Sequence, residues 1–485
     1  MLLPLFALLL PACTGGKTPD SPGDTVGNDD TGEPLPSPTE RCGYTAATDL
    51  DPADGVVGIE LSQAPFEWDP GTGTMLTEGL AYNGEVPGPV IEAELGQTLR
   101  TEFTNGLAYD STVHWHGLRV PDEMDGAIRM MDMVPAGGSF TYEFMLKDAG
   151  FYWYHPHMAT EQDLERGLYG RIIVRHPDEP RVDCELPVVL DDILLDEDTL
   201  QVAPQDTDHM QLMGRLGNVL LANGRSDRRI EVKAGETMLL RLVNAANARY
   251  FDLTLEGQRM RVVGTDGGWL AEEVPVDNLV LGPGERAIVA VDWVGAPGDE
   301  LRLMSARFQL HDEDAHMSEY DPMGNGENPV MTFVIGDEAG TPTPMTLPSD
   351  DVPAFTGEEP VAHTWVLDED MMNGIVTIDG ASYPDVPPVI VEANVPTAFV
   401  VQNDSEMHHP FHLHGNRFQV LAVNGVPPEI DGWKDTFDIP PFGSVEIASA
   451  LDNPGEWMFH CHILEHAELG MAGFFMVGEG MDDGM

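Results

Sequence analysis

The histidines of this chain gather in four short motifs whose spacing could hold metal ions. Ten of the 16 histidines in the 485 residues lie within His114–His116, His155–His157, His409–His414 and His460–His466. On a β-strand, residues i and i+2 point to the same face, so each His-X-His pair would present two imidazoles side by side. A single pair is weak evidence of metal binding, but four in one chain predict a cluster of metal ions.

The fourth motif, His460-Cys461-His462, indicates which metal is bound. If Cys461 points to one face of a strand, the histidines on either side of it point to the other face. The thiolate could then join His409 and His466 in a trigonal site, with Met471 as a weak axial ligand. This set of ligands selects copper in its blue, electron-transferring form. Structural zinc is the alternative, but zinc prefers closed tetrads of cysteine and histidine.

One pattern of residues occurs three times, which indicates three related domains. Each copy has a turn followed by three positions nine residues apart. The turns are Asn83-Gly84, Asn223-Gly224 and Asp379-Gly380, and the spaced positions are Gly96, Asn105 and His114, then Gly235, Asn244 and Leu253, then Asn394, Asn403 and His412. The second copy carries Leu253 and Leu255 where the others carry histidine pairs. We therefore expect a metal-free middle domain that acts as a spacer, and a metal cluster where the outer domains meet.

Short alternating segments separated by glycine, proline and asparagine are typical of β-strands. Examples are Val90–Glu94, Thr98–Phe103 and Thr237–Val243. No long segment has helical periodicity, so we expect an all-β chain of three Greek-key β-sandwiches in series. The expected parts are a signal at 1–13, a disordered tether at 14–54, domains at 55–178, 179–337 and 361–485, and a linker at 338–360.

The four motifs, in this order, resemble those of the multicopper oxidases, a family that includes laccases, ascorbate oxidase and bacterial copper-efflux oxidases. The resemblance extends from about Gly55 to Gly478. It implies three cupredoxin-like domains, four copper ions, and the reduction of O2 to water with electrons from a donor. The implied ligands are His409, Cys461, His466 and Met471 for the type 1 copper, His114 and His412 for the type 2 copper, His116, His155 and His462 for one type 3 copper, and His157, His414 and His460 for the other.

The segment Gly117–Gly126 also resembles the bacterial members. In these an acidic residue at the position of Asp125 helps to deliver protons to the three-copper site. The resemblance therefore implies a catalytic role for Asp125 beside that of Cys461, and a surface carboxylate is the alternative interpretation. Rival classes fit less well, because a copper nitrite reductase has two domains, an electron carrier needs only type 1 ligands, and a structural relative would have lost some of them.

The electron donor is less well defined by the sequence. Laccase-like members oxidise phenols and aromatic amines, whereas efflux-type members oxidise cuprous ion near methionine and acidic residues. Methionine is also a common filler of irregular cores. We expect laccase-like oxidation of phenols, with cuprous oxidation as the alternative. The residues that support the alternative are Glu406, Met407 and Glu468 near the type 1 histidines, and the methionine clusters Met124, Met130, Met131 and Met133, Met210 and Met213, Met317 and Met323, and Met371 and Met372.

The charge of the chain excludes some partners. Its 83 acidic residues against 24 basic ones give a formal net charge of -59, so a nucleic acid would be repelled. Such a surface is heavily hydrated and suits a salty medium, where self-repulsion is screened. The expected partners are O2 and a small phenolic or aromatic reductant or Cu(I), and the chain is expected to be a monomer.

The N-terminus is typical of an exported protein. Residues 1–12 are almost wholly apolar, and Leu10–Cys13 resembles the cleavage box of a bacterial lipoprotein, although no basic residue precedes the apolar run. We expect a periplasmic or outer-membrane protein with a lipid anchor on Cys13, or alternatively a secreted one. In such an oxidising compartment Cys42 and Cys184 could form a disulfide, and two free thiols are the alternative.

Overall fold

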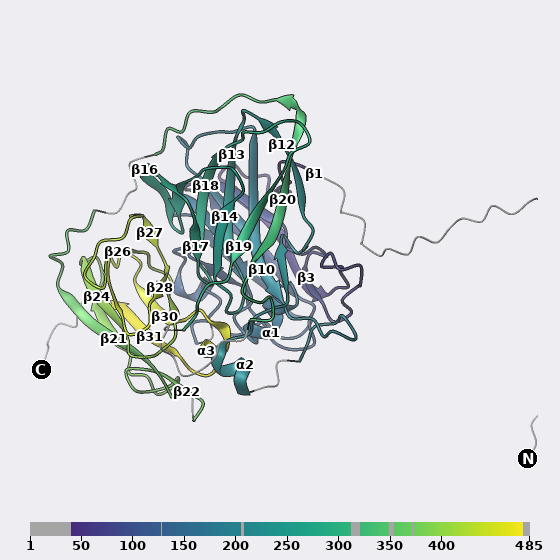
Figure 1. Ribbon diagram of the computed structural model, residues 1–485. Coiled ribbons are helices and arrows are strands. Elements are labelled where there is room, and N and C mark those ends of the chain that lie inside the picture. The colour runs from purple at the N-terminus through teal and green to yellow at the C-terminus, as the bar shows by residue number, and fades with distance from the viewer. Residues whose placement is uncertain are drawn as a thin grey trace, which may run out of the picture. The chain divides into compact units, whose positions relative to one another are not determined.

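The computed structural model describes residues 40–127, 129–204, 208–311, 321–348, 354–370 and 373–478. The chain divides into two units, residues 1–36 and residues 37–485, and the second contains all of the strands discussed below. The expected signal, the lipidated Cys13, Met317, Met371 and Met372 lie outside the described residues. Strands dominate the second unit, which confirms the all-β prediction (Figure 1).

The first β-sandwich consists of two four-stranded sheets around one apolar core. One sheet has the order β3-β2-β5-β7 and the other β4-β9-β8-β6. Its strands are β2 (Val56–Pro65), β3 (Leu80–Tyr82), β4 (Val90–Glu94), β5 (Thr98–Asn105), β6 (His114–His116), β7 (Ser139–Met145), β8 (Gly150–His155) and β9 (Gly170–Arg175). Alternate residues of β5 are buried, as expected for a strand with one face on the core.

The middle sandwich has two six-stranded sheets, with the orders β1-β12-β20-β19-β14-β17 and β11-β10-β13-β18-β15-β16. Leu253 and Leu255 are buried in its core, where they take the positions of the histidine pairs. Its strands are β1 (Glu40–Arg41), β10 (Cys184–Ile193), β11 (Val219–Ala222), β12 (Arg229–Ala234), β13 (Thr237–Asn244), β14 (Phe251–Leu255), β15 (Met260–Thr265), β16 (Gly268–Val276), β17 (Leu279–Leu281), β18 (Arg286–Asp292), β19 (Glu300–Ala306) and β20 (Glu327–Ala339).

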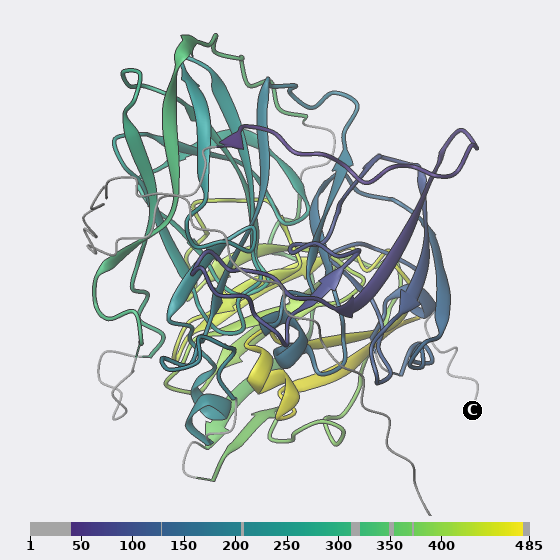
Figure 2. The same ribbon diagram turned by 90° about the vertical axis from the view of Figure 1, so that its right-hand side faces the viewer.

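The third sandwich pairs a sheet of order β22-β21-β24-β29-β26-β27 with one of order β23-β31-β30-β25-β28. Figure 2 shows its yellow strands beside those of the other two sandwiches. Its strands are β21 (Val361–Asp370), β22 (Ile375–Ile378), β23 (Val389–Glu392), β24 (Thr397–Asn403), β25 (His409–Leu413), β26 (Phe418–Val423), β27 (Trp433–Lys434), β28 (Thr436–Ile439), β29 (Ser444–Ser449), β30 (Gly455–Cys461) and β31 (Ala472–Gly478).

The helices of the described residues are short and lie in the connections between strands. They are the 3-10 helix η1 (Asp122–Met124), α1 (Thr160–Glu165), α2 (Asp208–Met213) and α3 (Leu464–Glu468). Helices α1 and α2 both contact α3, although the three helices belong to three different sandwiches (Figure 1). No helix among the described residues is long and apolar enough to cross a membrane.

The three copies of the sequence pattern have the same local structure. Asn105, Asn244 and Asn403 each donate their side-chain amide to two or more backbone carbonyls and accept the N–H two residues further on. Each two-residue turn has positive φ at both positions, a conformation that asparagine, aspartate and glycine tolerate best. The repeat therefore marks three related sandwiches.

The segment before the first sandwich corrects one expectation. Residues 40–54 were expected to belong to a disordered tether, but β1 pairs in parallel with β12 of the middle sandwich. A disulfide joins Cys42 to Cys184, which confirms that prediction. This segment is fixed by backbone hydrogen bonds to a sheet edge and by a covalent cross-link. The amino-acid composition of the segment predicts neither of these. At the other boundary, β20 continues to Ala339, inside the expected linker.

Candidate metal centre

Two histidines and one cysteine meet inside the third sandwich. Cys461 ends β30, His409 begins β25, and His466 lies on α3. The Cys461 Sγ atom is 3.5 Å from Nδ1 of His409 and 3.8 Å from Nδ1 of His466, and the two nitrogens are 3.3 Å apart. Strands β25 and β30 are paired next to each other, so residues far apart in sequence form one trigonal group of donor atoms.

The second nitrogen of each imidazole is held by a hydrogen bond. His409 Nε2 lies 2.8 Å from the Ser405 hydroxyl oxygen, which donates its own proton to Asn403 Oδ1. His466 Nε2 lies 2.9 Å from the carbonyl oxygen of Leu212 on α2. A carbonyl oxygen only accepts, so His466 carries its proton on Nε2 and leaves the Nδ1 lone pair facing the sulfur. Such contacts orient metal-binding histidines.

Two methionines lie beside this group. Met471 and Met407 are fully buried in the same apolar cluster as Cys461. The Met471 carbonyl accepts a hydrogen bond from the Cys461 N–H. The backbone of the expected axial residue therefore lies next to that of the cysteine. Met407 is fully buried, so its sulfur does not face solvent.

Burial makes the cysteine a poor thiolate on its own. It raises the pKa of the Cys461 thiol above its ordinary value. A metal cation bonded to the sulfur removes that penalty, because a coordinating thiol is deprotonated outright. One cysteine and two histidines whose donor atoms converge therefore fit a copper ion in a buried site.

Eight further histidines form a second group where the first and third sandwiches meet. Strands β6 and β8 and the loop after β8 supply four, β25 and the residue after it supply two, and β30 and the residue after Cys461 supply two. Three subsets have donor atoms within 4.8 Å of one another, namely His114, His116 and His155, then His114, His412 and His414, then His157, His414 and His460. His462 lies beside them, with its ring 5.1 Å from that of His116.

Hydrogen bonds fix four of these eight imidazoles in the same way. The Nδ1 atoms of His114, His155, His412 and His460 lie 2.8–2.9 Å from backbone carbonyl oxygens. Each of these rings therefore carries its proton on Nδ1 and directs its Nε2 lone pair inward. For His114, His155 and His412 the inward Nε2 atom is buried and has no hydrogen-bond partner. Buried nitrogen lone pairs that converge without partners fit metal ions, which bind neutral imidazole.

The environment also keeps the histidines neutral. Burial, and then repulsion between neighbouring imidazoles, lowers the pKa of His116, His155, His157, His409, His412 and His460. The pKa of His462 falls to about 3 and that of His466 to about 4, with burial as the main cause. A neutral imidazole has the lone pair that a metal requires.

Asp125 lies in this group, not on the surface. It is buried, and its Oδ2 atom is 2.8 Å from Nδ1 of His414. Its backbone carbonyl accepts the Nδ1–H of His114, and its Oδ1 atom lies 3.5 Å from the same nitrogen. Burial opposes ionisation, but the facing imidazoles of His414 and His114 hold the pKa of Asp125 below its ordinary value.

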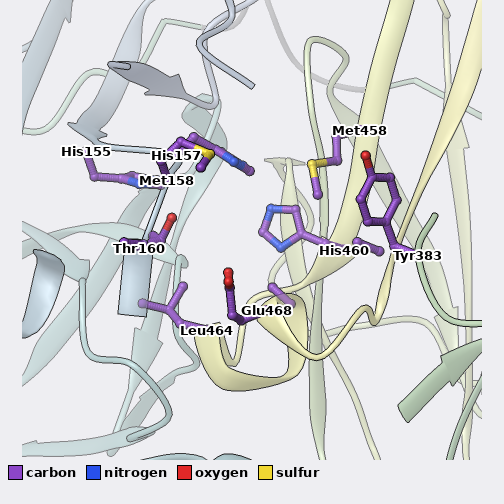
Figure 3. Close-up of a pocket in the computed structure, with 12 residues that line it drawn as sticks. His155, His157, Met158, Thr160, Tyr383, Met458, His460, Leu464 and Glu468 are labelled. Atoms are coloured by element: carbon purple, nitrogen blue, oxygen red, sulfur yellow. The ribbon is translucent and has the colours of Figure 1, made fainter. Parts of the chain in front are cut away.

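A pocket of about 180 Å³ lies beside the histidine group, between the first and third sandwiches. Figure 3 shows His157 and His460 on opposite sides of it, with the carboxyl group of Glu468 directed towards the space between them. Glu468 was considered as an aid to a donor at the type 1 site. The structure instead places it in this pocket, beside two histidines of the eight-histidine group.

Three contacts of the site were not predicted from the sequence. Leu212 covers His466 from another domain, Ser405 holds His409, and Asp435 lies 3.1 Å from Nε2 of His116. Asp435 also joins His116 and His412 in one group of possible metal ligands. The nine-residue repeat could have directed attention to Ser405, because it lies two residues after Asn403, but a lone serine in a loop is common.

Comparison with known proteins agrees with this geometry. Models of multicopper oxidase domains match residues 67–179, 186–309 and 356–481. The multicopper oxidase MmcO of Mycobacterium tuberculosis is 29% identical over 483 residues, which cover 90% of this chain and 91% of that protein. The chain therefore belongs to the multicopper oxidase family, whose members are copper-binding oxidoreductases.

Two solved structures are also similar to this chain. A multicopper oxidase from Campylobacter jejuni, described as a metallo-oxidase, has a TM-score of 0.80 and 27% identity, and the match covers 92% of this chain and 96% of that one. A laccase-like multicopper oxidase from Ochrobactrum sp., with activity towards lignin model compounds, has a TM-score of 0.78 and 28% identity, and the match covers 90% and 100%. A metallo-oxidase and an oxidase of lignin model compounds thus both occur among similar structures.

Proposed function

We propose that this chain takes single electrons from a donor at the His409, Cys461 and His466 site and uses four of them to reduce O2 to water at the eight-histidine group. The strongest support is that consecutive residues of the chain link the two sites through the backbone. Cys461 belongs to the first site, and its two neighbours, His460 and His462, belong to the second. When bound, copper would supply one-electron exchange at the first site and the binding and reduction of O2 at the second.

The proposed assignment of ligands follows the family pattern, and two of its sets, His409, Cys461 and His466 and His157, His414 and His460, each have donor atoms within 4.8 Å of one another. His409, Cys461 and His466, with Met471 as axial ligand, would hold type 1 copper. The eight-histidine group would hold three ions, through His114 and His412 for type 2, through His116, His155 and His462 for one type 3, and through His157, His414 and His460 for the other.

The remaining features of the site would transfer protons to the eight-histidine group and let O2 reach it. Reduction of O2 to two waters consumes four protons in a buried place, so a carboxyl group beside the histidines can act as a relay. Asp125 is suited to this because its Oδ2 atom contacts His414 directly. The pocket between His157 and His460 offers O2 and water a way to the same group.

The geometry favours a metal ion as the donor, the alternative that the sequence left open. Both imidazoles of the type 1 group are fully buried, and α2 covers the outer nitrogen of His466. In this arrangement the ring of a phenolic donor would have no direct contact with either imidazole. A buried carboxyl group, that of Glu369, lies 3.8 Å from His409 Nε2, and burial raises its pKa to about 7. A nearby cation would favour its charged form, so we propose cuprous ion as the main donor.

Phenolic donors form the second candidate, because the laccase-like structure from Ochrobactrum sp. is similar over 90% of this chain. Oxygen uptake by the copper-loaded enzyme with cuprous ion, a small phenol and a bulky phenol separates the two. A metal donor predicts the fastest uptake with cuprous ion and the slowest with the bulky phenol. Glu369→Gln should then lower the cuprous rate alone, while Glu392→Gln, at an exposed carboxylate of β23, should change neither rate. Equal rates for both phenols, above the cuprous rate, would contradict it.

We further propose that the chain is exported and acts as a monomer, anchored through Cys13 or secreted. The disulfide between Cys42 and Cys184 supports an oxidising compartment, because the cytosol keeps most thiols reduced. Mass spectrometry of the protein from its native cells should find either a lipid on Cys13 or, if the protein is secreted, an N-terminus from which the signal has been cleaved. A full-length N-terminus in the cytosolic fraction would contradict export.

A further inference from the structure

One imidazole of the eight-histidine group is turned the opposite way from its neighbours. The Nε2 atom of His116 lies 3.1 Å from Oδ1 of Asp435 and 3.1 Å from the Thr436 hydroxyl oxygen, and its Nδ1 atom is buried without a hydrogen-bond partner. In His114, His155 and His412 it is Nδ1 that is hydrogen-bonded and Nε2 that is left without a partner. Nε2 of His116 is therefore held by two side chains, Asp435 and Thr436, whereas Nδ1 of these three histidines contacts a backbone carbonyl.

Asp435 is in turn held by the middle domain. Arg286, on β18, donates from Nη1 to one carboxylate oxygen of Asp435 at 2.5 Å and from Nη2 to the other at 2.6 Å. A paired, bidentate contact of this kind fixes both the position and the rotation of a carboxylate. Both side chains are almost fully buried, so the pair is screened little by solvent.

Arg286 is itself fixed on several sides. Its Nε donates to the carbonyl of Phe151 in the first sandwich, and its Nη2 donates to the carbonyl of Asp266. The Asp266 carboxylate accepts the backbone N–H of Arg286 and the ammonium group of Lys434, which also contacts Glu285. The guanidinium thus joins all three sandwiches at the edge of the histidine group.

The backbone is shaped to admit this arrangement. A Cβ atom on Gly117 would lie 2.3 Å from Arg286 Nη2 and 2.5 Å from Asp435 Oδ2. Gly284 lies two residues before Arg286, in the loop that leads into β18. A Cβ atom on Gly284 would lie 2.8 Å from the ring of His462. Both glycines have positive φ. The middle domain therefore contacts Asp435 through Arg286 and lies against the ring of His462 at Gly284, although it supplies none of the proposed copper ligands.

We infer that the middle domain is more than a spacer, and that Arg286 and Asp435 form a clamp that makes His116 present Nδ1 to copper. The inference rests on the proposed copper function and deepens it. Arg286 and Asp435 are positioning residues, since they act on the ligand and not on the reacting atoms. Outer partners of metal-binding histidines typically change metal affinity or activity by about 10–100-fold.

The test uses Arg286→Met and, as a matched control, Arg241→Met. Arg241 is another fully buried arginine of the middle domain, paired with Glu179 and Glu185 and not with a residue of the copper sites. Copper affinity is measured by competition with a chelator, and electron paramagnetic resonance separates the type 1 and type 2 signals. We expect Arg286→Met to weaken copper binding at the eight-histidine group by about 10–100-fold while the blue type 1 copper is retained. Equal affinity in the two variants would overturn the clamp.

A second variant separates orientation from charge balance and from misfolding. Arg286→Met leaves a buried carboxylate without its cation, whereas Arg286→Met with Asp435→Leu removes both charges. The double variant should fold and keep its blue copper, yet still bind copper weakly at the eight-histidine group. Restored affinity in it would overturn the clamp. If the wild-type group itself binds no copper, the proposed function fails, and this outcome is distinct from failure of the clamp.

Discussion

The Oδ2 atom of Asp125 lies 2.8 Å from Nδ1 of His414, although the two residues are 289 positions apart in the sequence. This contact brings a carboxyl group from the loop after β6 against an imidazole that follows β25. A buried carboxyl group in contact with a histidine of the eight-histidine group is well placed to pass protons to the site where O2 would be reduced.

Replacement of Asp125 by asparagine should slow the reduction of O2 without slowing the reduction of the blue copper by the donor. Positioned proton transfer contributes about 10²–10⁴-fold to rates, so Asp125→Asn should slow oxygen uptake by about that factor. The blue copper should still be reduced by the donor at its normal rate in stopped-flow measurements without oxygen. Glu123→Gln, at an exposed carboxylate two residues away, serves as the control. Unchanged oxygen uptake in Asp125→Asn would remove its role as a relay.

Much of the fold and of the site could be predicted because both depend on local spacing. The nine-residue steps reflect strands of similar length in each sandwich, and alternation along β30 explains why Cys461 and its neighbours serve different groups. The contacts of Leu212 with His466 and of Arg286 with Asp435 join segments with no shared periodicity. Only the packing of the three sandwiches against one another creates them.

Core mutations in the middle sandwich should lower the free energy of unfolding and leave the copper content unchanged. Leu253 is fully buried at the position of a histidine in the other copies. Leu253→Ala should therefore cost about 2–5 kcal/mol of unfolding free energy, measured in urea, because it leaves a cavity. Val280→Ala, at a more exposed position of β17, should cost much less. A change in copper ions per chain in Leu253→Ala would contradict the prediction.

The retention of copper at low pH should follow the lowered histidine pKa values. Protons and copper compete for the same lone pairs. In the folded protein His462 and His466 are protonated only near pKa values of about 3 and 4, well below an ordinary histidine. Their lone pairs thus stay available as the pH falls through the ordinary range and are lost only below it. Copper should therefore be retained between about pH 7 and pH 5 and released as the pH falls below about 4.

Copper per chain after dialysis at each pH, with circular dichroism to detect unfolding, checks this prediction. Release of half the copper near the ordinary histidine pKa of about 6.5, with the fold intact, would show that burial does not protect the ligands.

The copper content and colour of the protein, with and without Cys461, test the central claim most directly. The copper-loaded wild type should contain about four copper ions per chain and be blue, because thiolate bonded to cupric ion gives the colour. Cys461→Ser should abolish the colour and oxygen uptake with the donor while about three ions stay bound at the histidines. A Cys461→Ser protein that remains blue, or a copper-loaded wild type that is colourless, would contradict the account.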